Sequence, residues 1–210
     1  MWCQLPKIRY TFAPMNENQW TENVIIADAD FVDKVVFDLT VNFERMLERQ
    51  IPQADLARWT ECVALDGGLR NGDHQTTVAL IHDKERTRMD NIVPGNYDDL
   101  NGKAFQGPLG EFLISAISTE GLATKEDLLL DTLQICCSQK EVKRVMVIPD
   151  DYIYNKVREM LRQVDDDDKR ITVFAMTPQQ GGNFRQEILG YSLMAALGIR
   201  GEEIRGKSEE

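Results

Sequence analysis

Two short, unbroken apolar runs constrain the fold of this chain more than any other feature. Residues 24–27 (Val-Ile-Ile-Ala) and residues 145–148 (Val-Met-Val-Ile) contain no polar residue. A strand of this composition is buried on both faces, which is typical of a parallel sheet that helices cover on both sides. Apolar residues then recur at helical spacing from Val32 to Leu47. The chain is therefore predicted to be an α/β protein with central parallel strands.

The order of the predicted elements indicates one domain over residues 1–198. Besides the two apolar runs, strands are expected at three places: 76–81, 111–118 and 171–176. Helices are expected at five places: 30–50, 53 to the Gly67-Gly68 pair, 124–137, a segment around 157–161, and 184–197. Parallel strands that follow one another need helical crossovers of this length, so we expect a three-layer α/β/α fold with a largely parallel, doubly wound sheet of five or six strands.

The remaining segments carry weaker patterns. Residues 1–22 are expected to form an N-terminal strand or arm, because Ile8, Tyr10 and Phe12 alternate with polar residues. Residues 89–110 contain many Pro, Gly and Asn turn signals and are expected to form a long loop. The run 165–169 (DDDDK) is expected to be solvated, and the charged tail 199–210 is expected to be frayed.

The composition disfavours several classes of function. Asp and Glu outnumber Lys and Arg by 35 to 24, so the average surface repels nucleic acids and acidic membranes unless basic residues gather locally. No apolar run is long enough for a membrane span and the N-terminus lacks a signal-peptide core, so a cytoplasmic protein without membrane contact is expected. The four cysteines lack the paired spacing that zinc sites need, which disfavours a zinc site. The chain has only two histidines that could act as a base, which disfavours a cysteine nucleophile. The oligomeric state stays open, a homodimer included.

Carboxylates follow both apolar runs. Asp28 and Asp30 come directly after the first run, and Asp150 and Asp151 follow the second. If the two strands are neighbours, these four side chains meet at the edge of the sheet where α/β proteins bind ligands. Clustered carboxylates without Cys or His favour Mg²⁺ or Mn²⁺, which serve phosphoryl chemistry. The alternative is that these aspartates only cap the helices that follow the strands.

At these positions the chain resembles the NYN branch of the PIN-like metal-dependent nucleases. The stretch VIIADAD with Asp28 and Asp30 is similar to the family's first motif, Asp131 falls where a helix aspartate lies, and VMVIPDDY places Asp150 in the third motif. The resemblance implies a PIN-like Rossmannoid fold and Mg²⁺- or Mn²⁺-dependent cleavage of RNA, with Asp28, Asp30, Asp131 and Asp150 as catalytic residues. We expect these four to converge in one cleft, with Asp151 nearby.

The chain departs from the nuclease pattern at three places. Lys125 stands where the family has an earlier helix aspartate, Tyr152 stands where it has a final aspartate, and Ile148-Pro149 replaces Ser-Gly. Single-stranded RNA would have to be attracted by a local basic patch, for which the sequence offers four residues: Lys84, Arg86, Arg88 and Lys103. His82 and Asp83 lie at the end of another predicted strand. Either they line the same cleft, or His82 is exposed at the end of the strand, which is the expectation preferred here.

Two other functions remain open. The Asp-x-Asp turn also resembles haloacid dehalogenase-like phosphohydrolases, in which the first aspartate is the nucleophile and the second a general acid. Ser118 or Thr119, Lys143 and the pair Asp150-Asp151 follow in the order of the remaining motifs, which implies a small phosphoester as substrate. The third alternative is a non-catalytic interaction or scaffold protein, which fits the acidic charge and the missing motif residues.

Overall fold

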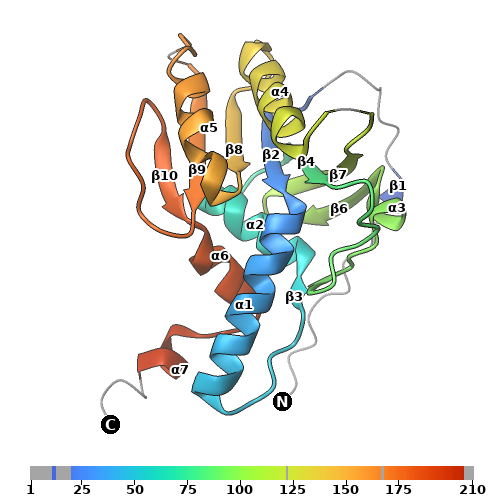
Figure 1. The fold of residues 1–210 in the computed structure, drawn as a ribbon. Helices are drawn as coiled ribbons and strands as arrows, with labels where there is room; N and C mark the ends of the chain where they lie inside the picture. Colours follow the sequence, from blue (N-terminus) through green and yellow to red (C-terminus); the bar gives the residue numbers. More distant parts are fainter. Residues whose placement is uncertain (1–10, 13–19, 122, 167, 206–210) are drawn as a thin grey trace.

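The computed structural model describes residues 11–12, 20–121, 123–166 and 168–205, and its core is an eight-stranded sheet (Figure 1). In spatial order the strands are β1 (Thr11–Phe12), β6 (Lys103–Gly107), β7 (Gly110–Ser118), β4 (His74–His82), β2 (Asn23–Asp28), β8 (Arg144–Ile148), β9 (Arg170–Ala175) and β10 (Arg185–Ile188). Two further short strands, β3 (Ala54–Asp55) and β5 (Ile92–Val93), form a separate parallel pair.

The sheet is doubly wound, as the sequence predicted, but it has eight strands and not the expected five or six. From β7 to β10 every neighbouring pair of strands is parallel, whereas β6 and β1 continue the sheet in antiparallel pairs. If the six parallel strands are numbered in sequence from β2, their spatial order across the sheet is 3-2-1-4-5-6. The two apolar runs lie side by side in β2 and β8, with Val24 opposite Val145 and Ala27 opposite Ile148.

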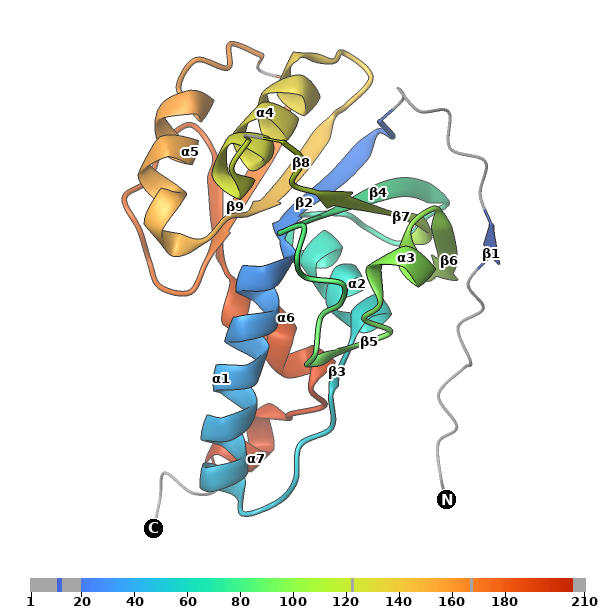
Figure 2. The ribbon, with the colours of Figure 1, turned by 45° about the vertical axis from the view of Figure 1, so that its right-hand side comes forward.

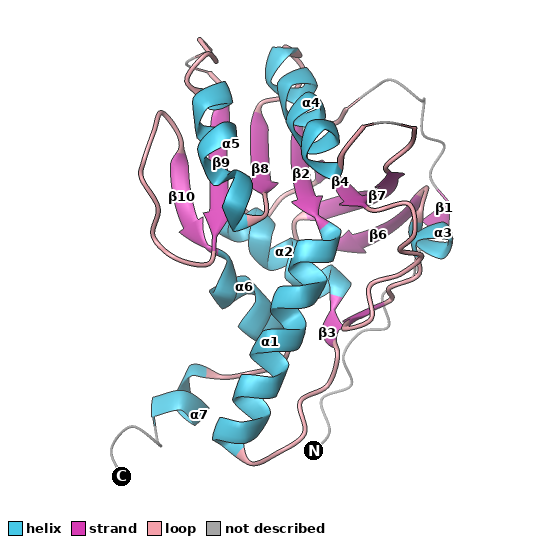
Figure 3. Ribbon diagram, viewed as in Figure 1, coloured by secondary structure: helices cyan, strands magenta, loops and turns pink. Residues whose placement is uncertain are grey.

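Helices cover both faces of this sheet (Figure 3). Their bounds are α1 Ala29–Leu47, α2 Leu56–Asp66, α3 Tyr97–Leu100, α4 Lys125–Ser138, α5 Tyr154–Leu161, α6 Leu189–Ala196 and α7 Gly201–Arg205, with a 3-10 turn η1 at Asp151–Ile153. Alternate residues of β2 divide the core between the layers. Ile25 packs with residues of α1, α2 and α6, and Ile26 packs with residues of α4 and α5. The three-layer α/β/α architecture is thus confirmed.

Helix α1 follows β2 without a connecting loop and extends beyond the sheet (Figure 2). The sequence suggested that Asp30 caps this helix, but the N-cap is Asp28, whose Oδ1 accepts a hydrogen bond of 2.9 Å from the Phe31 backbone N–H. The helix also ends at Leu47, earlier than the expected Gln50, because Glu48 adopts a left-handed conformation with φ of 54°.

The segment 89–110 was expected to be a long loop, and this prediction is wrong. It contains β5, α3 and β6 and leads directly into β7. The turn residues mark the boundaries of short elements instead: Gly102 and Gly110 have φ of +73° and +110° next to β6 and β7. At Gly110 a Cβ atom would also lie 2.0 Å from the His74 carbonyl oxygen, so only glycine fits beside β4.

The C-terminal helix begins later than predicted. Residues 185–188 form the edge strand β10, so Asn183 does not cap a helix from residue 184. Gln186 instead donates a hydrogen bond to the Tyr154 hydroxyl and accepts one from the Gln179 backbone. In the predicted tail, residues 201–205 form α7.

At the N-terminus β1 is an edge strand, as expected for Phe12, whereas Ile8 and Tyr10 lie outside the described residues. Among the described helices, none has both the length and the apolar character that a membrane crossing requires.

Candidate functional site

The carboxyl ends of β2, β4 and β8 meet where the winding of the sheet reverses. Asp28 ends β2, Asp83 follows β4, and Asp150 lies two residues after β8. From β2 the chain crosses one face of the sheet to reach β4, and from β8 it crosses the opposite face to reach β9. The carboxyl ends of the strands at such a reversal are the usual ligand position in doubly wound sheets.

Lys125 lies at the centre of this region. Its ammonium nitrogen is 2.9 Å from Asp28 Oδ1, 3.1 Å from Asp30 Oδ2 and 3.7 Å from Asp83 Oδ2. Lys125 is the first residue of α4, and the start of that helix is fixed by a capping box between Thr124 and Asp127. The cap therefore directs one ammonium group toward three carboxylates.

Arg86 supplies the second cation. Its Nη2 lies 3.1 Å from Asp33 Oδ2, and its Nε lies 3.5 Å from Asp30 Oδ1. The backbone N–H of Asn91 donates to the other oxygen of Asp33 at 2.7 Å, and the backbone N–H of Asp83 donates to Asp30 at 2.8 Å. We call the following six residues the acidic cluster: Asp28, Asp30, Asp33, Asp83, Arg86 and Lys125.

Burial and charge act against each other in the acidic cluster. Asp28 is 2% exposed, and burial raises its pKa although the Lys125 ammonium lowers it. Burial alone would lower the pKa of Lys125. The charges and hydrogen bonds of Asp28 and Asp30 together raise it by more than burial lowers it, so the pKa of Lys125 lies above the ordinary lysine value. Lys125 is therefore charged at neutral pH, and its charge compensates the nearby carboxylates.

Of the aspartates predicted as site residues, the structure joins Asp28 and Asp30 through Lys125. Asp150 caps η1 by accepting a hydrogen bond from the Tyr152 N–H at 3.2 Å, and Asp151 accepts one from the Met176 N–H at 3.5 Å. Asp131 is exposed on α4, about 9 Å along the helix from Lys125 at 1.5 Å per residue. Among the described residues, neither Asp131 nor Asp150 forms an ion pair with the acidic cluster.

The chain belongs to the DUF6621 family. The family model, described as a family of unknown function, matches residues 17–204 and thus covers every strand of the sheet except β1, and every residue of the acidic cluster. Comparisons with curated proteins and with solved structures found no significant match.

Tyr97 and His82 border the acidic cluster of this DUF6621 protein, and sequence reasoning did not find Tyr97. The His82 ring stacks on the Tyr97 ring with centroids 3.8 Å apart, so His82 is buried and not exposed as expected.

The Tyr97 hydroxyl and Asp30 Oδ1 are both buried without a hydrogen-bond partner. Burial, Asp30 and Asp33 raise the pKa of Tyr97, which keeps its hydroxyl protonated. A cavity of about 580 Å³ opens beside the rings of His82 and Tyr97, at the carboxyl ends of β4 and β7.

The oxygens of the acidic cluster nearest Lys125 are already occupied by hydrogen bonds. Asp28 Oδ1 already accepts hydrogen bonds from the Phe31 N–H and from Lys125, and Asp30 Oδ2 accepts from Lys125 and the Asp83 N–H. Within the part of the chain that the structure describes, no group of three or more His, Cys, Asp or Glu side chains is arranged to hold a metal. A divalent cation would therefore have to displace Lys125 before it could bind these two oxygens.

Other residues expected at the site lie elsewhere or have other partners. Arg86 pairs with the acidic cluster and Arg88 pairs with Asp90 at 3.1 Å, so neither extends freely as the proposed basic patch requires. Lys143 precedes β8 and lies at the amino end of the sheet, about 16 Å from the carboxyl end of that five-residue strand. Ser118 ends β7 and Thr119 follows it, and β4 separates β7 from β2.

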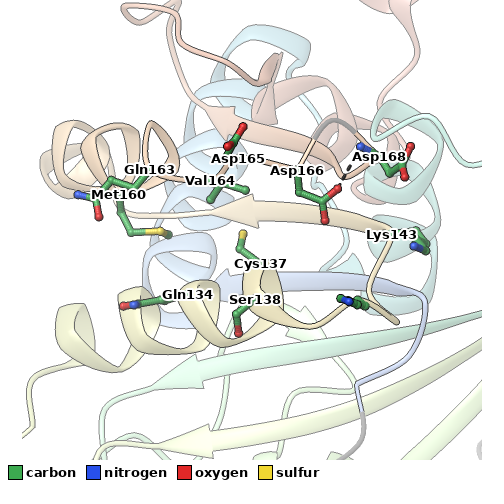
Figure 4. A pocket seen from close by; sticks show the side chains of 11 residues that line it. Gln134, Cys137, Ser138, Lys143, Met160, Gln163, Val164, Asp165, Asp166 and Asp168 are labelled. Carbon is green, nitrogen blue, oxygen red and sulfur yellow. Dashed lines mark hydrogen bonds between the residues drawn. The ribbon is translucent and has the colours of Figure 1, made fainter.

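A further cavity of about 670 Å³ lies between the C-terminal halves of α4 and α5 (Figure 4). Its lining combines Lys140 and Lys143 with three aspartates of the loop before β9: Asp165, Asp166 and Asp168. The Cys137 thiol also lines it, but burial raises the pKa of this thiol to about 11, so it is not a reactive thiolate. None of the residues of the acidic cluster lines this cavity.

Proposed function

We propose that this DUF6621 protein is a PIN-like α/β protein whose acidic site is closed by Lys125, and that it acts as a non-catalytic binding protein. The observation that supports this proposal most directly is the position of the Lys125 ammonium, 2.9 Å from Asp28 and 3.1 Å from Asp30. In the nuclease family that the sequence resembles, a helix aspartate stands in place of Lys125. The exchange removes one carboxylate and adds one positive charge.

Electrostatics explain why this exchange disfavours a metal. A divalent cation about 4 Å from an ammonium group is repelled by roughly 8 kcal/mol at an effective dielectric constant of about 20. The Lys125 charge already compensates Asp28 and Asp30, so the carboxylates gain less from a metal than an unpaired cluster would. A Mg²⁺- or Mn²⁺-dependent ribonuclease would need this lysine to move out of the acidic cluster.

Burial also argues against the phosphohydrolase alternative. The side chain of Asp28, which would be the nucleophile, is 3% exposed. Its Oδ1 contacts the Lys125 ammonium group and accepts a hydrogen bond from the Phe31 backbone N–H at the start of α1. A nucleophilic carboxylate must reach the phosphorus atom of its substrate. For Asp28 this would require the start of α4 to move away.

Metal binding by a charge-reversed variant tests the proposal. Lys125→Asp restores a carboxylate at the family's position, so we expect it to bind Mn²⁺ in a calorimetric titration and to show a higher unfolding temperature with Mn²⁺ than without. The wild type should show neither effect at about millimolar metal. Lys34→Asp is the matched control, because Lys34 is exposed on α1 and the substitution makes the same change in net charge.

Activity assays complete this test. Wild type, Lys125→Asp and Asp28→Asn are incubated with Mn²⁺ and either single-stranded RNA or a generic phosphomonoester. We expect no turnover by the wild type. Metal-dependent RNA cleavage by the wild type that is lost in Asp28→Asn would overturn the proposal in favour of a ribonuclease, and phosphomonoester cleavage alone would favour the phosphohydrolase. If Lys125→Asp does not bind Mn²⁺, the proposal that Lys125 keeps a metal ion out of the acidic cluster is wrong.

A further inference from the structure

Arginines gather at the amino end of the sheet, the edge opposite the acidic cluster. The neighbouring parallel strands β8, β9 and β10 each begin with an arginine: Arg144, Arg170 and Arg185. These strands run side by side in the same direction, so their first residues share one edge (Figure 1). Arg70, shortly after the end of α2, lies at the same edge. All four arginines line one cavity.

This cavity, the arginine pocket, has a volume of about 610 Å³. Its lining consists of the four arginines and seven neutral residues, which are Gly67, Gly68, Ile171, Thr172, Gly182, Asn183 and Phe184. The volume is within the range of pockets that hold a small organic ligand. In a protein with a formal charge of −11, a pocket lined by four cations and no carboxylate is a strong local reversal of charge.

The arginines of this pocket are close enough to repel one another. Arg144 and Arg170 are paired residues on neighbouring strands, about 4.8 Å apart across the sheet. A Cβ atom on Gly68 would lie 2.9 Å from Arg144 Nη1 and 3.7 Å from Arg185 Nη1, so glycine leaves room for both guanidinium groups. Burial and then the charges of Arg170 and Arg70 lower the pKa of Arg144.

Nearby carboxylates compensate this charge only in part. Glu187 pairs with Arg185, Asp66 also interacts with Arg185, and Glu22 interacts with Arg144. None of these three carboxylates lines the arginine pocket. Among the described residues, Arg70, Arg144 and Arg170 have no ion-pair partner. The fold therefore holds positive charge at this edge in excess of what its own side chains neutralise.

Arg144 carries a buried donor without an acceptor. Its Nη1 donates to the Gly67 carbonyl, but its Nε is buried and has no hydrogen-bond partner. A buried donor left without an acceptor costs about 1–3 kcal/mol of stability, more for a charged group. An anion in the pocket would supply acceptor oxygens to the surrounding guanidinium groups, which bind phosphate through two parallel hydrogen bonds.

We propose that the arginine pocket binds a small molecule that carries two or more linked phosphate groups, such as inorganic pyrophosphate or a nucleoside polyphosphate. The three arginines without an ion-pair partner among the described residues, Arg70, Arg144 and Arg170, match the three to four negative charges of such a ligand, whereas a single phosphate would leave charge uncompensated. This inference goes beyond the proposed function, because it concerns the opposite edge of the sheet and holds whether or not the acidic cluster is catalytic.

Calorimetric titration of the full-length protein tests this inference. The ligands are pyrophosphate, ATP, adenosine and a single-stranded RNA oligonucleotide, each without divalent metal and at low and high salt. We expect pyrophosphate or ATP to bind with a dissociation constant below about 100 μM, more weakly at high salt, and adenosine not to bind. Tighter binding of ATP than of pyrophosphate would identify a nucleotide, and equal binding would identify the diphosphate group alone.

Charge-reversed variants assign the binding to the pocket. Arg70→Glu and Arg170→Glu change exposed side chains, so both should fold, and circular dichroism checks this. We expect each variant to weaken binding by about tenfold or more, because each removes charge-assisted hydrogen bonds. Arg45→Glu, exposed in the last turn of α1, is the matched control and should bind like the wild type.

Three outcomes would overturn the inference. The first is no binding of pyrophosphate or ATP at millimolar concentration, and the second is an equal loss of affinity in Arg45→Glu and in the pocket variants. The third is that only a single-stranded RNA oligonucleotide binds, with affinity lost in Arg70→Glu and Arg170→Glu. That result would make the pocket part of a nucleic-acid surface and exclude a site for small phosphates.

Discussion

The ammonium group of Lys125 and the carboxylate of Asp28, 2.9 Å apart, join the two helical layers of the protein at the end of the central strand. Asp28 ends β2 and caps α1 on one face of the sheet, while Lys125 begins α4 on the other face. One oxygen of Asp28 thus contacts both helices: it accepts a hydrogen bond from the Phe31 backbone N–H in α1, and it pairs with the ammonium group of Lys125 in α4. Because the pair is largely buried, its loss should affect the stability of the whole domain.

We predict that Lys125→Met destabilises the protein in a pH-dependent way. The substitution leaves Asp28 buried without its cation, which should lower the free energy of unfolding by about 3 kcal/mol near pH 8. Burial already raises the pKa of Asp28, and the loss of Lys125 removes the charge that opposes this rise. Stability linked to a raised carboxyl pKa is present at low pH and lost as the pH rises through that pKa, so the deficit should shrink toward about pH 5.

Urea unfolding at several pH values measures this effect. Lys34→Met is the control, because it removes the same charge from an exposed position on α1 and should change the free energy of unfolding by less than about 0.5 kcal/mol. A deficit of Lys125→Met that stays constant from pH 5 to 8 would contradict the assigned link to Asp28 and indicate a loss of packing instead.

Asp28 and Asp131, both predicted as catalytic residues, should respond differently to the same substitution. Asp28→Asn keeps an oxygen that can cap α1 but removes the charge that pairs with Lys125, so we expect a loss of about 1–3 kcal/mol in the free energy of unfolding. Asp131→Asn changes an exposed residue of α4 and should alter it by less than about 0.5 kcal/mol. Thermal unfolding of both variants at neutral pH provides the comparison, and equal losses would show that Asp131 also belongs to the buried network.

The central strands and most helices could be predicted because their patterns are local and strong. The unbroken apolar runs at 24–27 and 145–148 required burial on both faces, and they are neighbours in β2 and β8. A helix was predicted at 124–137, and α4 begins directly after Thr124, which caps it in a capping box with Asp127. For the same reason the sequence placed Asp28 and Asp30 correctly at the carboxyl end of the first parallel strand.

The errors concern features that depend on distant partners. The polar strand β10 forms only because β9 offers an edge, and nothing within residues 185–188 reveals that partner. Lys125 was recognised only as a departure from a motif, because no local pattern shows that its ammonium reaches Asp28, 97 positions earlier in the sequence. Likewise, the four residues of the arginine pocket come from separate strands and one loop, so only the folded sheet brings them together.

Lys169 is a further case in which a residue expected to be solvated is buried. It ends the run 165–169, yet its side chain is 1% exposed, and Asp166 is its only carboxylate neighbour within the described loop, at 3.9 Å. The ammonium group donates hydrogen bonds to three backbone carbonyls at and beyond the end of α4, those of Cys136, Gln139 and Val142, at 3.3, 2.7 and 3.0 Å. A cation at a helix C-terminus satisfies carbonyls that have no partner within the helix and interacts favourably with the helix dipole.

We therefore predict that Lys169→Met lowers the free energy of unfolding by about 3–5 kcal/mol. Methionine fills a similar volume but leaves the three carbonyls buried without a charged donor, and each hydrogen bond to a charged group contributes about 1.5–3 kcal/mol. Lys140→Met is the control, because Lys140 is exposed close to the same end of α4. Urea unfolding compares the two variants, and hydrogen exchange should show faster exchange in the last turn of α4 in Lys169→Met alone. A Lys169→Met variant as stable as Lys140→Met would mean that water or the loop before β9 replaces the ammonium at these carbonyls.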